Sequence, residues 1–179
     1  AEILYITANA LSSQSIYPLS NFYLNLAKFL NEDFHSYDTL LAENYYKIDN
    51  LENAKEVYKN LSKKGDAYKW YSTKQISRIY IKEEKKDEAI KLTKDVYKRL
   101  NKKNIYETFD FAELLKNNEK FEESIIYYTS VLNQIKKDHP LYPEATDGRG
   151  VAYERVGRWD KAEKDLLSSL KANPNQAYV

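Results

Sequence analysis

A pattern that repeats about every 35 residues constrains the fold of this chain more than any other feature of the sequence. Small residues stand at the five positions of a first column: Ala8, Ala42, Ser77, Ala112 and Gly150. A second small residue follows each of them after 12 residues, and this second column is Ser20, Ala54, Ala89, Ser124 and Ala162. Because the inner spacing is constant while the outer spacing varies, the sequence predicts a rigid two-element unit with adjustable connections.

Larger side chains recur around the small ones at helical spacing. Three residues after the first column stand Leu11, Tyr45, Tyr80, Leu115 and Tyr153. Four residues after the second column stand Leu24, Tyr58, Thr93, Tyr128 and Leu166, of which Thr93 fits least well because it places a hydroxyl where a large apolar group is expected. Separations of three and four put residues on one helix face. The polar positions between the columns mark a short turn: Ser15, Asp49, Glu84, Glu119 and Gly157.

These columns have a steric explanation. Two helices joined by a short turn cross closely, and a residue with almost no side chain lets their backbones approach. Gly and Pro number only four each, which argues against an all-β fold with many tight turns. The predicted fold class is therefore all-α, an α-solenoid of about five antiparallel helix–turn–helix repeats in one domain over residues 1–179. The expected repeats span roughly 1–34, 35–69, 70–104, 105–142 and 143–176.

The pattern resembles the tetratricopeptide repeat (TPR) family, in an array of the bacterial type. The best match runs from Gly150-Val-Ala-Tyr153 through Gly157-Arg-Trp159-Asp-Lys-Ala162 to Leu166 and Pro174. Two departures stand out. The early Trp of the family pattern is missing, with Trp70 slightly upstream of its place, and the first unit has a longer, Ser-rich turn before Pro18. The resemblance implies a right-handed superhelix whose first helices line a concave groove.

The resemblance also implies which residues face that groove, counted from the first small column. The candidate peptide- or partner-binding residues are Tyr5, Asn9, Thr39, Glu43, Tyr71, Lys74, Arg78, Tyr106, Phe109, Glu113 and Asp147. Aromatic and basic residues form the expected centre of this surface, and acidic residues flank it. Rigid aromatics with a nearby Arg are enriched in binding hot spots. The alternative is that these are ordinary exposed residues of a chain with 17 Tyr.

Some TPR domains hold a peptide carboxylate with two Lys, two Asn and one Arg, as in the co-chaperones of Hsp70 and Hsp90. Asn9 matches one position of that clamp, but Tyr5 and Tyr71 stand where Lys is needed. Counting from the third unit, Lys74 fits and Arg78 does not. The sequence therefore disfavours a chaperone-tail clamp.

Composition offers little for other chemistry. The chain has no Cys, which excludes thiolate metal sites and thiol nucleophiles. Its two His, His35 and His139, have no paired ligand at helical spacing and are expected at the surface. The net charge of +1 gives no field to attract nucleic acid. We therefore predict no enzyme activity, no metal, no cofactor and no nucleic-acid partner.

No apolar run is long enough to cross a bilayer, so no direct membrane insertion is expected. Composition fits a soluble protein that is cytoplasmic or periplasmic/exported. The expected function is a non-enzymatic scaffold or adaptor that binds a peptide or helix in the groove. The alternative is a structural spacer or self-associating segment of a longer solenoid. The last helix carries Leu166, Leu167 and Leu170 with nothing after it to cover them, which predicts a fragment of a longer array or an end-to-end homodimer through the C-terminal repeat.

Overall fold

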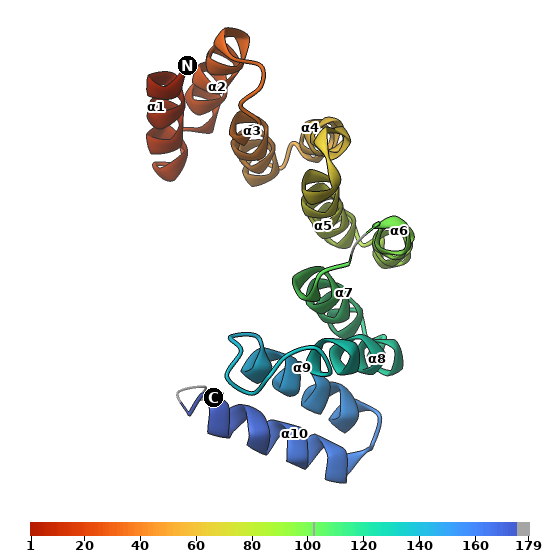
Figure 1. Cartoon of the computed structure of the whole chain (residues 1–179). Helices are drawn as coiled ribbons and strands as arrows, with labels where there is room; N and C mark the ends of the chain where they lie inside the picture. The colour runs from red at the N-terminus through yellow and green to blue at the C-terminus, as the bar shows by residue number, and fades with distance from the viewer. Residues whose placement is uncertain (102, 175–179) are drawn as a thin grey trace. The chain divides into compact units, whose positions relative to one another are not determined.

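A computed structural model describes residues 1–101 and 103–174, and this part of the chain holds ten α-helices, one short 3-10 helix and no strand (Figure 1). The helices are α1 (Glu2–Ser13), α2 (Tyr17–Leu30), α3 (Ser36–Lys47), α4 (Leu51–Leu61), η1 (Ser62–Lys64), α5 (Asp66–Lys82), α6 (Lys86–Arg99), α7 (Ile105–Asn117), α8 (Phe121–Leu132), α9 (Tyr142–Arg155) and α10 (Trp159–Ala172). The chain forms two compact units, Ala1–Val96 and Tyr97–Val179, and each is described by itself.

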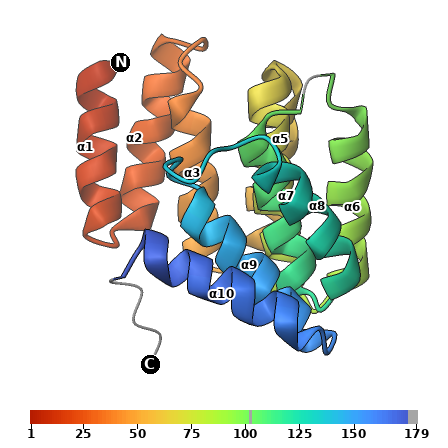
Figure 2. The same ribbon diagram turned by 60° about the horizontal axis from the view of Figure 1, so that its bottom comes forward.

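Both units are built from antiparallel helix pairs that lie side by side. In the first unit α1 packs on α2 and α3 on α4, and in the second unit α7 packs on α8 and α9 on α10 (Figures 1 and 2). Each pair then packs on the next within its unit, α2 on α3 and α8 on α9. The predicted all-α solenoid of helix–turn–helix repeats is confirmed.

The two small columns lie where the helices of a pair cross, as the spacing predicts. All ten residues of the columns are buried. In the first pair the Ser20 hydroxyl donates to the Ala8 carbonyl at 2.7 Å. In the third the Ser77 hydroxyl donates to the Ala89 carbonyl at 3.3 Å. Such contacts between the two columns require that neither residue carries a large side chain.

The five turns share one backbone conformation. The residues predicted to mark them all have positive φ: Ser15, Asp49, Glu84, Glu119 and Gly157, with φ from 62° to 74°. The next residue donates its N–H to the carbonyl five positions earlier, as Ile16 does to Leu11 at 2.9 Å and Arg158 to Tyr153 at 2.8 Å. This is the Schellman arrangement, which satisfies the last carbonyls of a helix. The first turn is not longer than the others, contrary to the sequence-based expectation, because α1 extends through Ser13 and absorbs the serines.

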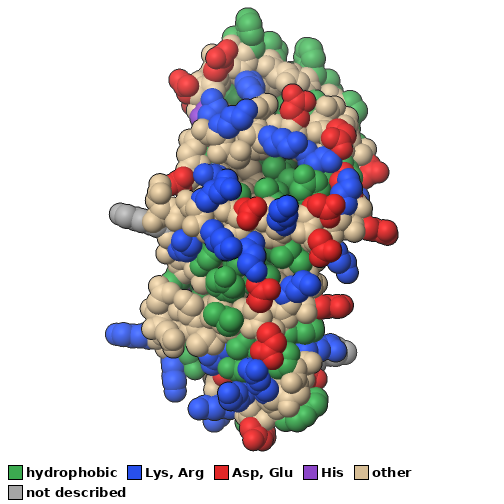
Figure 3. Space-filling view, turned by 90° about the vertical axis from the view of Figure 1, so that its right-hand side faces the viewer, with side chains coloured by type: hydrophobic (Ala, Val, Ile, Leu, Met, Phe, Trp, Pro, Cys, Tyr) green, Lys and Arg blue, Asp and Glu red, His purple; other side chains and the backbone are tan. Residues whose placement is uncertain are grey.

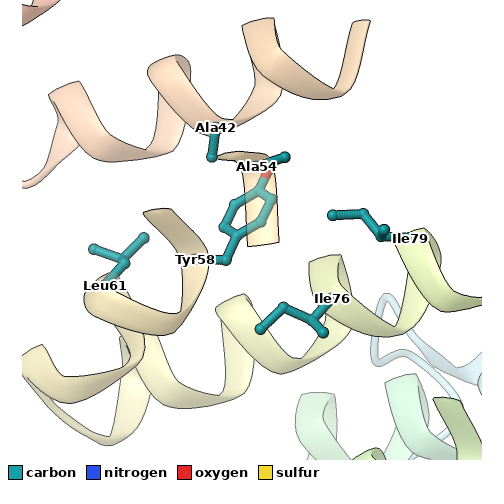
Figure 4. Packing of buried hydrophobic residues seen from close by; sticks show 6 residues of the cluster. All are labelled: Ala42, Ala54, Tyr58, Leu61, Ile76 and Ile79. Atoms are coloured by element: carbon teal, nitrogen blue, oxygen red, sulfur yellow. The ribbon is translucent and has the colours of Figure 1, made fainter. Parts of the chain in front are cut away.

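Large side chains fill the space between successive pairs. Tyr58 on α4 is fully buried. Its ring lies between Ala42 of α3 and two residues of α5, Ile76 and Ile79, and it also lies close to Ala54 of its own helix (Figure 4). This arrangement joins three helices through one side chain. Tyr58 therefore couples the second repeat to the third, as expected for elements that cannot bury their apolar faces alone.

Two buried polar side chains of the first unit, Thr93 and Asn44, have several hydrogen-bond partners. Thr93 lies 2.5 Å from the Ser77 hydroxyl and also donates to the Ala89 carbonyl at 2.9 Å. Asn44 donates to Ser20 and Asn21, both at 2.8 Å, and so links the second repeat to the first. Thr93 is therefore a satisfied polar contact rather than a defect, because Ser77 supplies what an apolar neighbour could not.

Two expected boundaries shift slightly. α5 begins at Asp66 after Gly65, so the expected start of the third repeat at residue 70 lies inside the helix, and α9 begins one residue before the expected 143. The division between the compact units lies within α6, after Val96.

The C-terminal helix differs in part from its prediction. Leu167 and Leu170 are about half exposed, at 48% and 49%, as the sequence predicts. Leu166, however, is partly buried and lies against Gly150 in the crossing of α9 with α10. The sequence places all three leucines on an open face, whereas the small residue at 150 leaves room for one of them.

The crossing at Gly150 gives a stability prediction. A Cβ at this position would lie 2.8 Å from Leu166 Cγ and 3.3 Å from the Leu166 backbone nitrogen. We expect Gly150→Leu to lower the free energy of unfolding by about 1–3 kcal/mol, because the overpacked crossing must open. Urea denaturation followed by circular dichroism measures this, with the exposed Lys164→Leu as control. An unchanged melting temperature in Gly150→Leu would contradict the close crossing.

Candidate functional site

The predicted groove residues lie on the first helix of each pair, on α1, α3, α5, α7 and α9. Not one of them is buried: Asn9, Arg78 and Tyr106 are exposed, and the other eight are partly buried. Small residues of the first column lie one, three or six positions away and pack into the helix crossing. Each first helix therefore buries one face in the core, and the predicted residues lie at the edge of that buried face.

In the first unit, Glu43 and Arg78 form an ion pair between successive repeats. Arg78 Nη2 lies 2.8 Å from Glu43 Oε2, and the two residues occupy the same position of the second and third repeats. The Arg78 guanidinium carbon also lies 3.9 Å from the centre of the Tyr46 ring. The sequence assigns Arg78 to a basic centre and Glu43 to an acidic flank, but the structure joins them into one pair of neighbouring charges.

Two tyrosines complete this first-unit cluster. The Tyr58 hydroxyl donates to Glu43 Oε2 at 3.4 Å, and its ring lies edge-on to the Tyr71 ring with centroids 6.1 Å apart. Burial raises the pKa of Tyr71, and the Glu43 carboxylate adds to this rise. Burial is also the main cause that raises the pKa of Tyr58. Both phenols are therefore neutral near pH 7 and keep their protons for hydrogen bonding.

The second unit holds a similar arrangement around Glu113. Its carboxylate accepts the Tyr128 hydroxyl and lies 2.8 Å from Lys116 Nζ. Phe109 lies edge-on to Tyr128, with ring centroids 6.0 Å apart. Burial is the largest cause that raises the pKa of Tyr128; the Glu113 and Asp147 carboxylates raise it further. Two predicted groove residues, Phe109 and Glu113, therefore contact one buried phenol.

The Tyr–Glu hydrogen bond is a repeated device that sequence reasoning missed. Glu43 and Tyr58 are separated by 15 residues, and so are Glu113 and Tyr128. The other repeats carry Leu24, Thr93 and Leu166 at the tyrosine position, and Asn9, Arg78 and Val151 at the glutamate position. At this position Glu therefore occurs only in the repeats that carry a tyrosine 15 residues later. The signal was present in the sequence, but it appears only when the two columns are compared repeat by repeat.

Some predicted residues have local partners of their own. Tyr5 packs against Phe34 and Tyr37, with ring centroids 5.4 and 5.5 Å away. The Thr39 hydroxyl donates to the Ser36 carbonyl at 2.8 Å. These contacts hold the two side chains in place on the first helices of the first unit. The Tyr5 ring and the Thr39 hydroxyl are thereby partly occupied by neighbours within the chain.

Tyr106 is 55% exposed, and its ring lies 6.2 Å from that of His139. His139 is partly buried and its Nδ1 accepts the Leu141 N–H at 3.1 Å, so it is not the surface residue expected. His35 is partly buried as well, edge-on to Tyr68. Both imidazole rings therefore pack against tyrosine rings within the fold.

The expected aromatic and basic centre combines residues of both units. Tyr71, Lys74 and Arg78 belong to the first unit, whereas Tyr106 and Phe109 belong to the second. Within the first unit the structure joins Arg78 to Glu43 and places Tyr71 beside Tyr58, which also contacts Glu43. Within the second unit it brings Phe109 and Glu113 together at Tyr128. One continuous centre formed by both sets remains a prediction.

Other site types have little support in residues 1–101 and 103–174. No group of three or more His, Asp or Glu there is arranged to hold a metal ion. None of its helices is both long and apolar enough to cross a membrane. On the face shown in Figure 3, Lys and Arg are interleaved with Asp and Glu rather than gathered by sign. A depression of about 550 Å³ in the first unit is lined by Lys28, Glu32, Asp38, Asn60, Lys63 and Lys64, none of which is a predicted groove residue.

Comparison with solved structures defines the class of fold: this is the helical array of TPR proteins. The chain is similar to YrrB, a TPR protein with an unusual peptide-binding site, at 18% identity and a TM-score of 0.62 over 97% of this chain and 86% of that one. It is similar to MamA at 15% identity and a TM-score of 0.66, over 99% and 97% of the two chains.

A third similar structure is a putative kinesin light chain of Podosopora anserina with nearly identical TPR-like repeats. It has 13% identity and a TM-score of 0.69, over 98% of this chain and 97% of that one. No family model and no curated protein matches the sequence. At these identities the likeness establishes the fold.

Proposed function

We propose that this chain is a non-enzymatic interaction scaffold that binds a protein segment, an extended peptide or a helix, along its first helices. The observation that carries the proposal is the cluster of Glu43, Tyr71 and Arg78 on α3 and α5. These side chains lie at the edge of a packed core. The Tyr46 ring contacts the Arg78 guanidinium, and the Tyr58 hydroxyl donates a hydrogen bond to the Glu43 carboxylate. Polar groups that are positioned before a ligand arrives lose little entropy on binding.

The chemistry of the two clusters suggests the kind of segment that fits. Each offers a carboxylate whose neighbours are a cation and a neutral phenol, and each lies beside an aromatic ring, Tyr71 or Phe109. A peptide with an aromatic or aliphatic anchor next to a basic side chain complements such a site. The peptide-binding site named for YrrB, a protein of the same fold, supports this function class.

A peptide selection tests the proposal. Peptides are selected from a random displayed library on the wild-type chain, and their affinities are measured by fluorescence polarisation. The triple variant Lys74→Ala, Arg78→Ala and Phe109→Ala is expected to weaken binding by at least about tenfold, because hot-spot residues carry most of the binding energy. The matched control Lys59→Ala, Arg99→Ala and Ile126→Ala replaces the same residue classes on the second helices, where the side chains are exposed.

The outcomes distinguish peptide binding in the groove from a groove face that binds no peptide. Loss of binding in the first triple variant alone, with unchanged helicity, supports the groove. Equal binding by both triple variants, or failure to select any peptide, overturns it.

The second candidate function, a spacer or self-associating segment of a longer solenoid, is favoured by the exposed Leu167 and Leu170 on α10. One form of this alternative is an end-to-end homodimer through these two leucines. Light scattering of the wild-type chain and of a Leu167→Glu and Leu170→Glu variant tests it.

A further inference from the structure

Helix α2 is apolar on two opposite faces. Ser20, Leu24 and Ala27 are fully buried against the neighbouring helices. On the other side Leu19, Phe22, Leu26 and Phe29 are 45%, 61%, 39% and 80% exposed. A helix that is hydrophobic all round is normally buried all round, so this face calls for an explanation.

The other repeats show what these positions normally carry. At the place of Phe22 they have Glu56, Lys91, Ile126 and Lys164. Counting the places of Leu19, Phe22, Leu26 and Phe29 together, fifteen of the sixteen equivalent residues are polar, with Ile126 as the exception. The outer face of the second helix is thus a solvent face in this array, and only the first repeat makes it apolar. Composition bias does not account for a difference between equivalent positions of one chain.

The spacing of the four residues identifies the kind of surface. Leu19, Phe22, Leu26 and Phe29 follow one another at intervals of three, four and three, which is the seam of a helix that packs against another helix. The seam contains no charge, so two identical seams meet without repulsion. Two copies related by a twofold axis present the same patch to each other, and such a patch needs only to be complementary to itself.

A lipid surface fits these residues less well. Helices that lie on membranes flank their apolar face with Lys and Arg. In α1 and α2 together Lys28 is the one basic residue, and its Nζ lies 2.6 Å from Asp38 of α3. The seam therefore has no basic border to attract anionic headgroups.

From these observations we propose that α2 is a self-association seam, through which two copies of this chain pair along Leu19, Phe22, Leu26 and Phe29. The exposed parts of these side chains, with Leu30 at the end of the helix, amount to roughly 500–600 Å² per chain, against about 800 Å² per partner in a standard interface. We expect an interface of that size to form a weak, reversible dimer.

Sedimentation velocity of the purified chain at increasing concentration tests the seam. The wild-type mass is expected to rise from 21.1 kDa towards twice that value. Phe22→Glu with Phe29→Glu is expected to weaken the dimer by at least about tenfold, since both charges would be buried in it. Ile126→Glu is the matched control, because Ile126 is 65% exposed at the position of Phe22 in the fourth repeat. Circular dichroism confirms that the variants keep their helicity.

Cross-linking adds a readout that depends on where the copies touch. The chain has no cysteine, so a single introduced one reports alone. Leu26→Cys is expected to give a covalent dimer with a short bismaleimide, whereas Ser130→Cys, the exposed equivalent in the fourth repeat, is not.

Three results would overturn the proposal. The first is a wild-type chain that remains at 21.1 kDa at several hundred micromolar. The second is a dimer that survives Phe22→Glu with Phe29→Glu but is lost in Leu167→Glu with Leu170→Glu, which would place self-association at the C-terminal helix instead. The third is a monomer that binds anionic phospholipid vesicles through Phe22 and Phe29, which would make the seam a lipid-binding face.

Discussion

Replacing Asp165 by alanine is expected to lower the free energy of unfolding by about 3 kcal/mol. Asp165 on α10 holds Arg149 on α9 with two hydrogen bonds, of 2.6 Å to Nε and 2.9 Å to Nη2. The side chains of Arg149 and Asp165 are only 19% and 8% exposed. Removing one partner of a buried pair leaves the other charge without compensation, which costs about 3–5 kcal/mol; the partial exposure of Arg149 favours the lower end.

The surroundings of Arg149 explain why the loss is not easily repaired. Burial opposes its charged form, but the Asp165 carboxylate outweighs this effect and raises the pKa of Arg149. Arg149 also donates to the Thr129 hydroxyl of α8 at 3.1 Å, so the same guanidinium ties the fourth repeat to the fifth. Urea denaturation followed at 222 nm measures the effect.

The control for this prediction is the double variant Arg149→Met with Asp165→Leu. Replacing both members of a buried ion pair by apolar residues of similar size is often close to neutral. We therefore expect the double variant to recover most of the stability that Asp165→Ala loses. If the double variant is as unstable as the single one, the loss comes from packing and not from the unpaired charge.

Tyr128→Ala is expected to lower the free energy of unfolding by about 3–5 kcal/mol, because it removes a fully buried aromatic ring that packs α8 against α7 and α9. A Cβ on Gly148 would lie 2.5 Å from Tyr128 Cζ, so the ring already fills the space above that glycine. The alanine variant leaves a cavity at the junction of two repeats. The measurement is again urea denaturation, with the slope of the transition checked for loss of cooperativity.

Two comparisons separate the ring from its hydroxyl. Tyr128→Phe removes only the hydrogen bond to Glu113, whose carboxylate keeps Lys116, and is expected to cost about 1 kcal/mol. Tyr106→Ala, at a tyrosine that is 55% exposed, is expected to change stability by less than about 0.5 kcal/mol. Equal losses in Tyr128→Phe and Tyr128→Ala would contradict the packing role.

The sequence predicted the parts of the fold that repeat. The small columns fix where the helices cross, because steric exclusion at a crossing depends only on residue size. The turn column fixes where the chain reverses, and its five members share one backbone conformation. Thr93 fits poorly within its own column, but its hydrogen-bond partner Ser77 lies in the other column, so a single column does not predict the contact.

The candidate site was predicted less completely. The register placed all eleven groove residues on the accessible side of the first helices, but it gave no partners. The ion pair of Glu43 with Arg78 joins residues 35 positions apart, and the Tyr–Glu bonds join different columns. The outer face of α2 does not follow from residues that are alike in every repeat, because its residues differ from their equivalents in the other four repeats.

The common geometry of the five turns has a consequence for how such an array changes length. Each hairpin is closed by backbone hydrogen bonds, and its reversal point tolerates Ser, Asp, Glu or Gly alike. Insertions and deletions are therefore accommodated in the stretches that join one hairpin to the next, such as the loop with Pro140 between α8 and α9. The spacing of neighbouring hairpins is thereby adjustable, while each pair of helices keeps its internal alignment.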